Sequence, residues 1–265
     1  KLFMQSSYFD IGANLTHESF ENDIEDVLNN ANIAGIKKIC INSTSIEDTK
    51  RSLEIVKKRE DLLITTCGIH PHYADSFDQS SILKLKDFTK NESVKAIGET
   101  GLDFNRNFSK KNNQIECFIS QLELAKELRL PLFLHQRDSH KEFLNCFEKV
   151  TPDVNAVVHC FTEDKKEFYQ YLDKGFWIGF TGWICDPVRG KHMQDLLSEM
   201  PLDKIMIETD SPYLLPKNLK VKGRRNEPKF IVEVAKKISE LQKKDLNVVT
   251  KILFSNSLKF FNLQQ

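Results

Sequence analysis

Eight short apolar runs alternate with longer amphipathic stretches from one end of the chain to the other. Each run contains roughly four to eight apolar-rich residues, which is the length of a buried strand. The runs cover residues 8–15, 36–43, 62–70, 94–100, 130–136, 154–160, 175–182 and 204–210. Between them, as in residues 115–129, apolar side chains recur every three or four positions, the spacing of one helix face. This alternation predicts a parallel sheet covered by helices.

Eight strand–helix repeats in a chain of 265 residues fit a closed (β/α)8 TIM barrel better than an open doubly wound sheet. An open sheet is the alternative, although no G-x-G-x-x-G sequence follows any of the runs. We expect one barrel domain over residues 8–265, with residues 142–150 as another of the helices between strands and an extra C-terminal helix at 248–263 outside the barrel. Residues 1–7 are expected to be an N-terminal extension or a remnant of cloning.

The composition excludes several classes of protein. Lys plus Arg equals Asp plus Glu at 38 each, which argues against a DNA coat protein that must neutralise many phosphates. An apolar run of about 18 residues, needed to span a membrane, is missing, and no secretory signal is visible. The six cysteines form no C-x-x-C pair and are expected to be thiols in a reducing cytoplasm. We expect a monomeric cytoplasmic protein without a membrane partner.

Polar residues stand at the carboxyl ends of five predicted strands: His70, Glu99, His135, His159 and Asp210. In a barrel these ends open on one face, where barrel enzymes keep their active sites. A single buried histidine is more readily explained as a polar group satisfied by the backbone. Five such residues at equivalent positions favour a functional site instead.

Two histidines and two carboxylates form a mixed nitrogen and oxygen donor set that suits Zn²⁺, Mn²⁺ or Mg²⁺. We therefore predict Glu99, His135, His159 and Asp210 as metal ligands. A bound metal lowers the pKa of water and polarises a phosphoryl or carbonyl oxygen. Glu208 shares a strand face with Asp210, but Asp210 lies nearer the barrel mouth. Asp210, as general base, and Glu99 are the predicted catalytic residues.

Several motifs resemble the TatD family of metal-dependent deoxyribonucleases in the amidohydrolase-like superfamily, and the TatD branch most of all. They are FDIGANLT (9–16), GIHPH (68–72), IGETGLDFNRNFS (97–109), PLFLHQRDSH (131–140), VVHCFT (157–162), GFTGWICD (179–186), IETDSPYLLP (207–216) and RRNEP (224–228). The resemblance runs from about Tyr8 to Phe261. It implies a metal-dependent nuclease on an amidohydrolase-type barrel. By motif position it implies the same four ligands that the strand ends indicate.

One departure from the superfamily pattern affects the metal. Many members begin with D-x-H-x-H, whose histidines hold one ion of a pair, whereas this chain has Asp10, Gly12 and Asn14 at those positions. The TatD branch shares this departure, so it does not by itself imply an inactive protein. Loss of two imidazoles shifts the donor set toward oxygen, which favours Mg²⁺ or Mn²⁺ over Zn²⁺. Mg²⁺ is the first expectation, with Mn²⁺ and Zn²⁺ as alternatives. Whether one or two ions bind is left open.

Further polar residues follow the strand ends. His70 and His72 flank a proline and are predicted to bind substrate, although a proline turn would also explain them. Arg106 and Arg137 are predicted to hold phosphate in a fork, although a loop salt bridge is nearly as good an explanation. Asp103 is predicted to support a ligand histidine from behind.

Aromatic and basic side chains also lie in the predicted mouth loops. The aromatic residues are Phe104, Phe108, Phe161, Trp183 and Tyr213. Bases of a single strand stack on such rings, yet 19 phenylalanines in one chain mean that most must lie in the core. The basic residues are Lys220, Lys222, Arg224 and Arg225, which form either a solvated loop or a surface that steers a phosphate backbone.

We predict a metal-dependent deoxyribonuclease that trims single-stranded DNA as a 3′–5′ exonuclease, with RNA as a second substrate. The first alternative is a hydrolase of esters, lactones or amides, because this fold serves many substrates. The second is a non-catalytic metal-binding or adaptor protein, which the missing D-x-H-x-H histidines suggest. Turnover of oligonucleotides, lactones and esters with added metal separates the three.

Overall fold

All eight predicted strands form in the computed structural model, which describes residues 6–264. They are Tyr8–Ala13 (β1), Ile36–Ile41 (β2), Leu63–Cys67 (β3), Val94–Asp103 (β4), Leu132–Arg137 (β5), Ala156–Val158 (β6), Trp177–Phe180 (β7) and Ile205–Ile207 (β8). The strands belong to one sheet and follow each other in chain order. The pairs β3–β4, β4–β5, β5–β6 and β7–β8 are parallel. This is the sheet of a (β/α)8 barrel.

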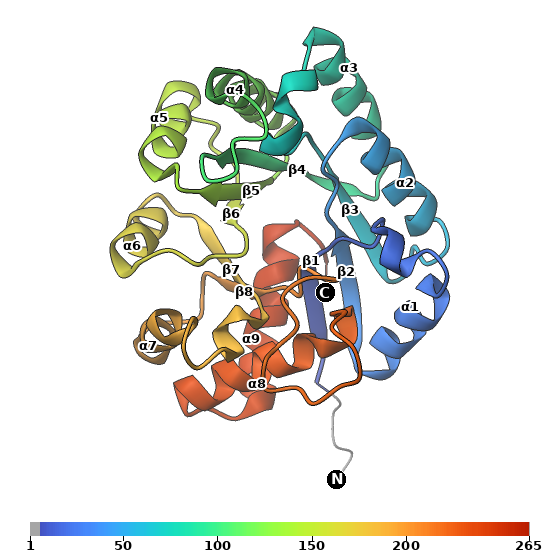
Figure 1. Ribbon diagram of the computed structural model, residues 1–265, viewed down its shortest axis with the longest axis vertical. Helices are drawn as coiled ribbons and strands as arrows, with labels where there is room; N and C mark the ends of the chain where they lie inside the picture. Colours follow the sequence, from blue (N-terminus) through green and yellow to red (C-terminus); the bar gives the residue numbers. More distant parts are fainter. Residues whose placement is uncertain (1–5, 265) are drawn as a thin grey trace. The chain divides into compact units, whose positions relative to one another are not determined.

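A helix follows every strand (Figure 1). The helices are Ile24–Ile33 (α1), Ile46–Val56 (α2), Gln79–Phe88 (α3), Lys111–Leu128 (α4), His140–Val150 (α5), Lys165–Asp173 (α6), Lys191–Glu199 (α7), Ile231–Gln242 (α8) and Leu246–Phe260 (α9). Short 3-10 helices lie at Glu18–Phe20, Pro71–Ser76, Gly182–Cys185 and Pro228–Phe230. The α/β barrel with an extra C-terminal helix is therefore confirmed. Residues 1–5 of the predicted N-terminal extension lie outside the described residues.

The chain divides into two compact units. The central unit is Ile41–His159, and the terminal unit joins the described residues before Ile41 to those after His159. Within the terminal unit the first strand lies beside the last. The amide of Asp210 donates to the carbonyl of Gly12 at 2.8 Å, and the amide of Asn14 donates to Ser211 at 2.8 Å. Contact between the first and last strands is what closure of a barrel requires.

The extra helix α9 packs against β1 and β8 in the terminal unit. Phe261, directly after α9, stacks on Phe9 of β1 with ring centroids 5.4 Å apart. Phe260 meets Trp177 of β7 edge-on at 6.1 Å. Such aromatic pairs stabilise packing beyond the area they bury, by about 0.5–1.5 kcal/mol each. The predicted terminal helix therefore carries part of the apolar core of this unit.

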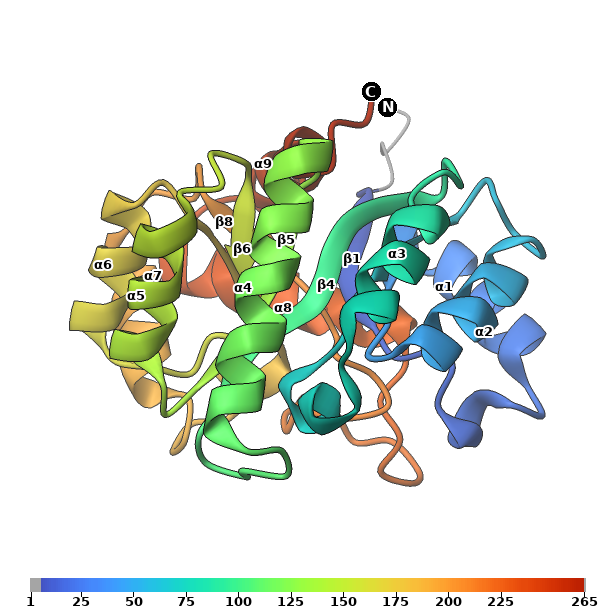
Figure 2. The same cartoon turned by 90° about the horizontal axis from the view of Figure 1, so that it is seen from above.

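In the central unit, helix α4 packs along β4 (Figure 2). Its spacing of apolar residues puts Phe118, Leu122 and Ala125 on one fully buried face. Phe118 stacks on Phe143 of α5 with centroids 5.2 Å apart, which joins the two helices. The helix ends where Arg129 adopts a left-handed conformation with φ of 54°.

Two glycines allow β4 and β5 to approach closely. Gly98 has φ of +153° and Gly101 has φ of +149°. A Cβ at position 101 would lie 1.8 Å from the carbonyl oxygen of His135, and one at position 98 would lie 2.3 Å from that of Phe133. Only glycine fits both the space and the backbone conformation. These positions flank Glu99, so the glycines let the part of β4 that carries Glu99 lie close to His135 on the adjacent strand.

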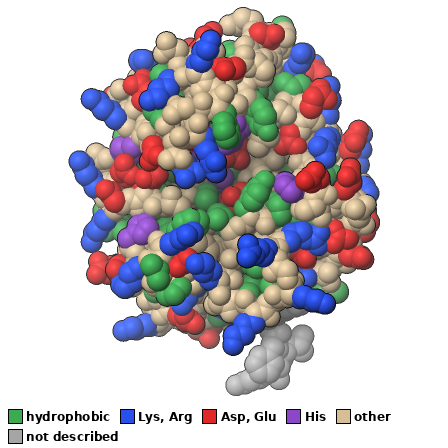
Figure 3. Space-filling model, viewed as in Figure 1, with side chains coloured by type: hydrophobic (Ala, Val, Ile, Leu, Met, Phe, Trp, Pro, Cys, Tyr) green, Lys and Arg blue, Asp and Glu red, His purple; other side chains and the backbone are tan. Residues whose placement is uncertain are grey.

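Other global expectations concern thiols, charge and membranes. All six cysteines are thiols, and five of them are buried. On the face drawn in Figure 3, Lys and Arg are interspersed with Asp and Glu. Within residues 6–264, no helix has the length and apolar character needed to cross a bilayer.

Candidate metal centre

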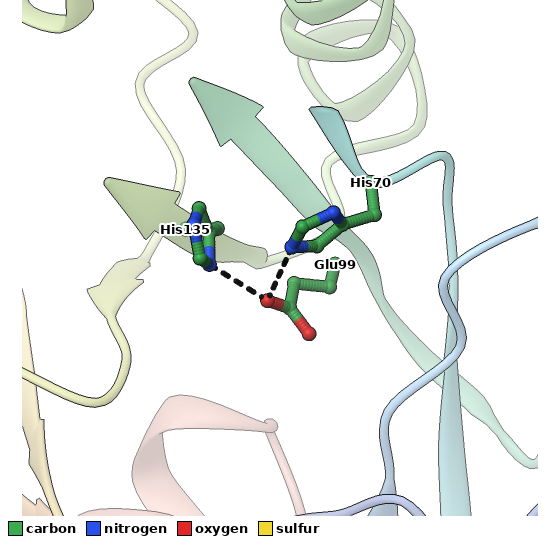
Figure 4. Close-up of side chains that lie close together, drawn as sticks. All are labelled: His70, Glu99 and His135. Carbon is green, nitrogen blue, oxygen red and sulfur yellow. Dashed lines mark hydrogen bonds and ion pairs between the residues drawn. The ribbon is translucent and has the colours of Figure 1, made fainter. Parts of the chain in front are cut away.

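Three histidine rings in the central unit surround one carboxylate oxygen. His70 Nε2 lies 3.2 Å from Glu99 Oε1, His135 Nδ1 lies 3.0 Å from it, and His159 Nε2 lies 2.8 Å from it. His70 and His159 follow β3 and β6, whereas Glu99 and His135 lie within β4 and β5. Figure 4 shows the rings of His70 and His135 directed at the same oxygen of Glu99. One ligand atom from each of these three residues falls within a 4.8 Å cluster.

The cluster is buried on most sides. Glu99, His70 and His159 are 5%, 6% and 5% exposed, whereas the His135 side chain is 20% exposed. Moving an ionised carboxylate from water into the protein interior costs roughly several kcal/mol of free energy unless charged or polar partners compensate it. His135 is the most accessible residue of the cluster.

The protonation states of Glu99 and His70 suit metal binding. Burial lowers the pKa of His70 to about 4, although the nearby Glu99 opposes this shift. Burial alone would raise the pKa of Glu99, but His159 and His70 hold it well below its ordinary value. Near neutral pH, Glu99 is therefore ionised and His70 is a neutral imidazole. Metal ligands must be in these forms.

Asp103 connects two histidines to the loop that follows β4. Its Oδ2 lies 2.9 Å from Nε2 of His72 and 3.3 Å from Nε2 of His135. Its Oδ1 accepts the amide hydrogens of Asn105 at 3.0 Å and Arg106 at 2.8 Å. Although burial opposes it, the hydrogen bonds from His135 and His72 hold the pKa of Asp103 well below its ordinary value.

The contact with Asp103 determines how His135 faces the cluster. An ionised carboxylate only accepts hydrogen bonds, so Nε2 of His135 carries a hydrogen toward Asp103. Nδ1 is then the atom directed at Glu99. The same contacts raise the pKa of His135 against the effect of burial, so a cation at Nδ1 would compete with a proton. A carboxylate behind a ligand histidine is a recurrent arrangement at metal sites.

The donor set fits a divalent cation. It combines imidazole nitrogens and an ionised carboxylate whose ligand atoms face one another. The sequence prediction that Glu99, His135 and His159 meet agrees with these distances. His70, which we predicted to bind substrate, lies in the same cluster.

Asp210, the fourth predicted ligand, belongs to the terminal unit and follows β8. Its Oδ1 accepts from Nδ2 of Asn14 at 2.9 Å, and it has a left-handed φ of 53°. Asn14 also bonds Ser211 through its backbone amide. The residue at the second histidine position of D-x-H-x-H therefore positions Asp210. Whether Asp210 is a ligand or a base stays a prediction.

Asp10, the residue at the aspartate position of D-x-H-x-H, bonds to the segment after β8 that also carries Asp210. Asp10 is fully buried, and its Oδ1 accepts the amide hydrogens of Gly12 at 3.2 Å and Thr209 at 2.9 Å. The Thr209 hydroxyl donates to Oδ2 at 2.5 Å. Burial raises the pKa of Asp10 to about 8. These bonds hold the backbone on either side of the β1–β8 contact.

The other predicted substrate-binding residues lie at the surface of the central unit. Arg106 and Arg137 are exposed, and His72 is half-buried through its bond to Asp103. The guanidinium of Arg106 lies 5.9 Å from the centre of the Phe108 ring. Both arginines therefore remain available to a solvent-borne phosphate.

The aromatic residues considered for stacking on bases differ in their exposure to solvent. Phe161 is only 2% exposed and packs in the core against Phe168, so it cannot stack on a base. Phe108 is 63% exposed and Tyr213 is 52% exposed. Phe104 and Trp183 are partly buried.

The four basic residues within positions 220–225 also differ in their surroundings. Lys220, Lys222 and Arg224 are exposed. Arg225 instead makes a two-pronged ion pair with Asp23, at 2.6 and 2.9 Å. This residue therefore ties the loop to the N-terminal part of its own unit.

Sequence reasoning overlooked Asn42. It follows β2 and is fully buried, and neither its amide nitrogen nor its amide oxygen has a hydrogen-bond partner among residues 6–264. The signal was present, because Asn42 is one of the two polar residues that end the second apolar run.

A (β/α)8 fold whose strand ends assemble histidines around a carboxylate defines a metal-dependent barrel hydrolase. The family model of TatD related DNases matches residues 9–262. The chain therefore belongs to the TatD family of DNases.

Individual relatives are similar over almost their whole length. The 3′-5′ ssDNA/RNA exonuclease TatD of Rahnella sp. is 39% identical over 258 residues, which are 96% of this chain and 98% of the relative. The protein of the same name from Erwinia tasmaniensis is 37% identical over 258 residues, 96% of this chain and 100% of the relative. A crystal structure of a hydrolase TatD family protein from Entamoeba histolytica has a TM-score of 0.89 at 29% identity, covering 97% and 98% of the two chains.

Proposed function

We propose that this chain is a 3′–5′ exonuclease that hydrolyses single-stranded DNA, and RNA as a second substrate, with a divalent cation held at Glu99. Its family makes it a metal-dependent nuclease. The polarity and the preference for single strands rest on the names of its relatives. The observation that carries the proposal is the convergence of three imidazoles on Glu99 Oε1.

Glu99, His135 and His159 would hold the cation, with His70 beside them and Asp210 as the proposed fourth ligand. A divalent cation, when bound, lowers the pKa of water and neutralises charge on phosphate oxygens. Asp210 would accept the proton of the attacking water, and its bond to Asn14 would fix the direction of its carboxylate.

The exposed guanidinium groups of Arg106 and Arg137 would hold the substrate. Each presents hydrogen-bond donors in a planar fork that matches two phosphate oxygens. Arg106 follows β4 and Arg137 is the last residue of β5, so each lies toward the carboxyl end of the strand that carries Glu99 or His135. We expect them to orient the strand for hydrolysis.

The number of imidazoles in the cluster also affects which metal ion we expect to bind most tightly. Gly12 and Asn14 led us to expect Mg²⁺ first. His70 adds an imidazole to those of His135 and His159, and imidazole favours Zn²⁺ more than Mg²⁺. We therefore expect Zn²⁺ or Mn²⁺ to bind more tightly than Mg²⁺. Tighter binding does not decide turnover, so the three ions must be compared in both measurements.

The test uses a 5′-labelled single-stranded oligonucleotide and protein stripped with a chelator, then supplied with Mg²⁺, Mn²⁺ or Zn²⁺. Shortening from the 3′ end gives a ladder of labelled products, whereas digestion from the 5′ end releases a labelled mononucleotide first. Glu99→Gln should reduce the rate at least about 100-fold, as losses of charge stabilisation at active sites do. Glu92→Gln, an exposed carboxylate before β4, is the matched control.

Full metal-dependent activity in Glu99→Gln would refute the assignment of the centre. Hydrolysis of lactones or aryl esters without any strand shortening would refute the substrate class. Metal binding without turnover of any substrate would favour the non-catalytic alternative.

A further inference from the structure

Phe108 is a large exposed aromatic side chain in the loop between β4 and α4. It is 63% exposed, although most phenylalanines of this chain lie in the core. A single exposed apolar residue is ordinary on a protein surface, as Leu83 on α3 illustrates at 69% exposure. Exposure alone therefore assigns nothing to Phe108, and its surroundings must decide.

The Phe108 ring contacts the ring of His72, which in turn contacts a histidine of the metal centre. Its centroid is 4.8 Å from that of His72, with the rings nearly perpendicular at 74°. The His72 ring is in turn 4.2 Å from that of His70. His70 contacts Glu99. Phe108 is thus two ring contacts away from a residue of the cluster.

The cationic side chain of Arg106 lies near the Phe108 ring. The guanidinium carbon of Arg106 lies 5.9 Å from the Phe108 centroid, and Arg106 is exposed. An aromatic face for a base and a cation for a phosphate therefore lie side by side. Single-stranded nucleic acid is bound by this combination of rings and positive charge.

The loop that carries the ring is held at both ends. Asp103 accepts the amide hydrogens of Asn105 and Arg106 at 3.0 and 2.8 Å. The hydroxyl of Ser109 donates to the carbonyl of His72 at 2.9 Å. Binding a base then requires little ordering of the loop, which improves affinity.

We propose that Phe108 is the platform on which a nucleobase of the substrate stacks, one or a few nucleotides from the bond hydrolysed, while Arg106 pairs with the adjoining phosphate. This rests on the proposed function, since it assumes a nucleic-acid substrate. Every base has an aromatic face, so the platform accepts any sequence. A base within a duplex already stacks on its neighbours, so the platform favours single strands.

The first measurement is kcat and KM on a single-stranded decamer for the wild type, Phe108→Ala, Phe108→Trp and Leu83→Ala. Phe108→Ala should raise KM by about 5- to 150-fold, the loss expected for one stacked base, with a smaller effect on kcat. Phe108→Trp should restore KM to near the wild-type value. Leu83→Ala, which removes a similarly exposed apolar side chain, should leave KM unchanged.

The second measurement identifies the base. Decamers with a single abasic nucleotide at successive positions should raise the KM of the wild type at one position. At that position the difference between the wild type and Phe108→Ala should disappear. An equal effect of Phe108→Ala on intact and fully abasic strands would overturn stacking and leave a merely structural role.

A binding measurement separates this proposal from the proposed function. 2-Aminopurine at the identified position should be quenched by Glu99→Gln protein and remain bright with the Glu99→Gln, Phe108→Ala double variant. Quenching that depends on Phe108 without any strand shortening by the wild type would refute the exonuclease and keep the platform. Strand shortening with an unchanged KM in Phe108→Ala would refute the platform and keep the exonuclease.

Discussion

Replacing Asp103 with asparagine tests whether this carboxylate orients the metal centre. The side chain keeps its size, and its remaining oxygen can still accept the amide hydrogens of Asn105 and Arg106. The oxygen that faces Nε2 of His72 and of His135, at 2.9 and 3.3 Å, becomes an amide group that donates hydrogen bonds. Two donors then face each other, so His135 must turn or move its hydrogen to Nδ1.

The expected cost follows from this loss of orientation. Carboxylates behind ligand histidines contribute about 10- to 100-fold to metal affinity, which is about 1.4–2.7 kcal/mol. The bond from His135 is the longer of the two at 3.3 Å, which favours the lower half of that range. We therefore expect Asp103→Asn to bind Mn²⁺ roughly 10- to 30-fold more weakly than the wild type.

Isothermal titration of stripped protein with Mn²⁺ measures this affinity without substrate. Asp75→Asn is the matched control, because Asp75 holds the other end of the same loop through Lys110 and Asn113. Circular dichroism and thermal melting establish that each variant is folded. Affinity within about twofold of the wild type in folded Asp103→Asn would refute the orienting role, as would an equal loss in Asp75→Asn.

Two further predictions concern stability. Gly101→Ala should lower the free energy of unfolding by at least about 3 kcal/mol, since its Cβ would meet the His135 carbonyl, whereas Gly175→Ala, with φ of +77° and open space, should cost only about 1–2 kcal/mol. Urea titrations measure both, and equal losses would contradict the close approach of β4 and β5. Burial raises the pKa of the Cys67 thiol to about 12, so the unfolded chain loses this proton first, and the stabilisation present below pH 9 declines as pH rises toward 12. Between pH 8 and pH 10 the unfolding free energy of the wild type should fall by about 1.4 kcal/mol more than that of Cys67→Ala; equal falls would count against this assignment.

The sequence determined the fold class because burial follows a local period. Apolar runs of strand length and helix-spaced segments alternate, and each became the expected element. Boundaries were less accurate: β4 extends to Asp103, three residues beyond the predicted run. Helix α8 was expected only as the helix after the eighth strand, and its bounds, Ile231–Gln242, were not predicted. The residues at which an element begins and ends depend on glycine contacts and on packing between segments, which a local pattern does not contain.

The sequence also indicated most residues of the candidate centre, because strand ends meet on one face of a barrel. Position alone selected Glu99, His135 and His159, and the structure brings them together around one oxygen. The resemblance to the family selected the same residues from their motifs.

Only the tertiary structure decided how the neighbouring side chains are used. It moved His70 into the cluster, directed Asp103 at two histidines, and turned Asn14 toward Asp210. It buried Phe161, whereas Phe108 stayed exposed. These differences depend on contacts between residues far apart in the chain, at distances of a few ångströms. Periodicity states which face a residue occupies, but only packing determines which atom it meets there.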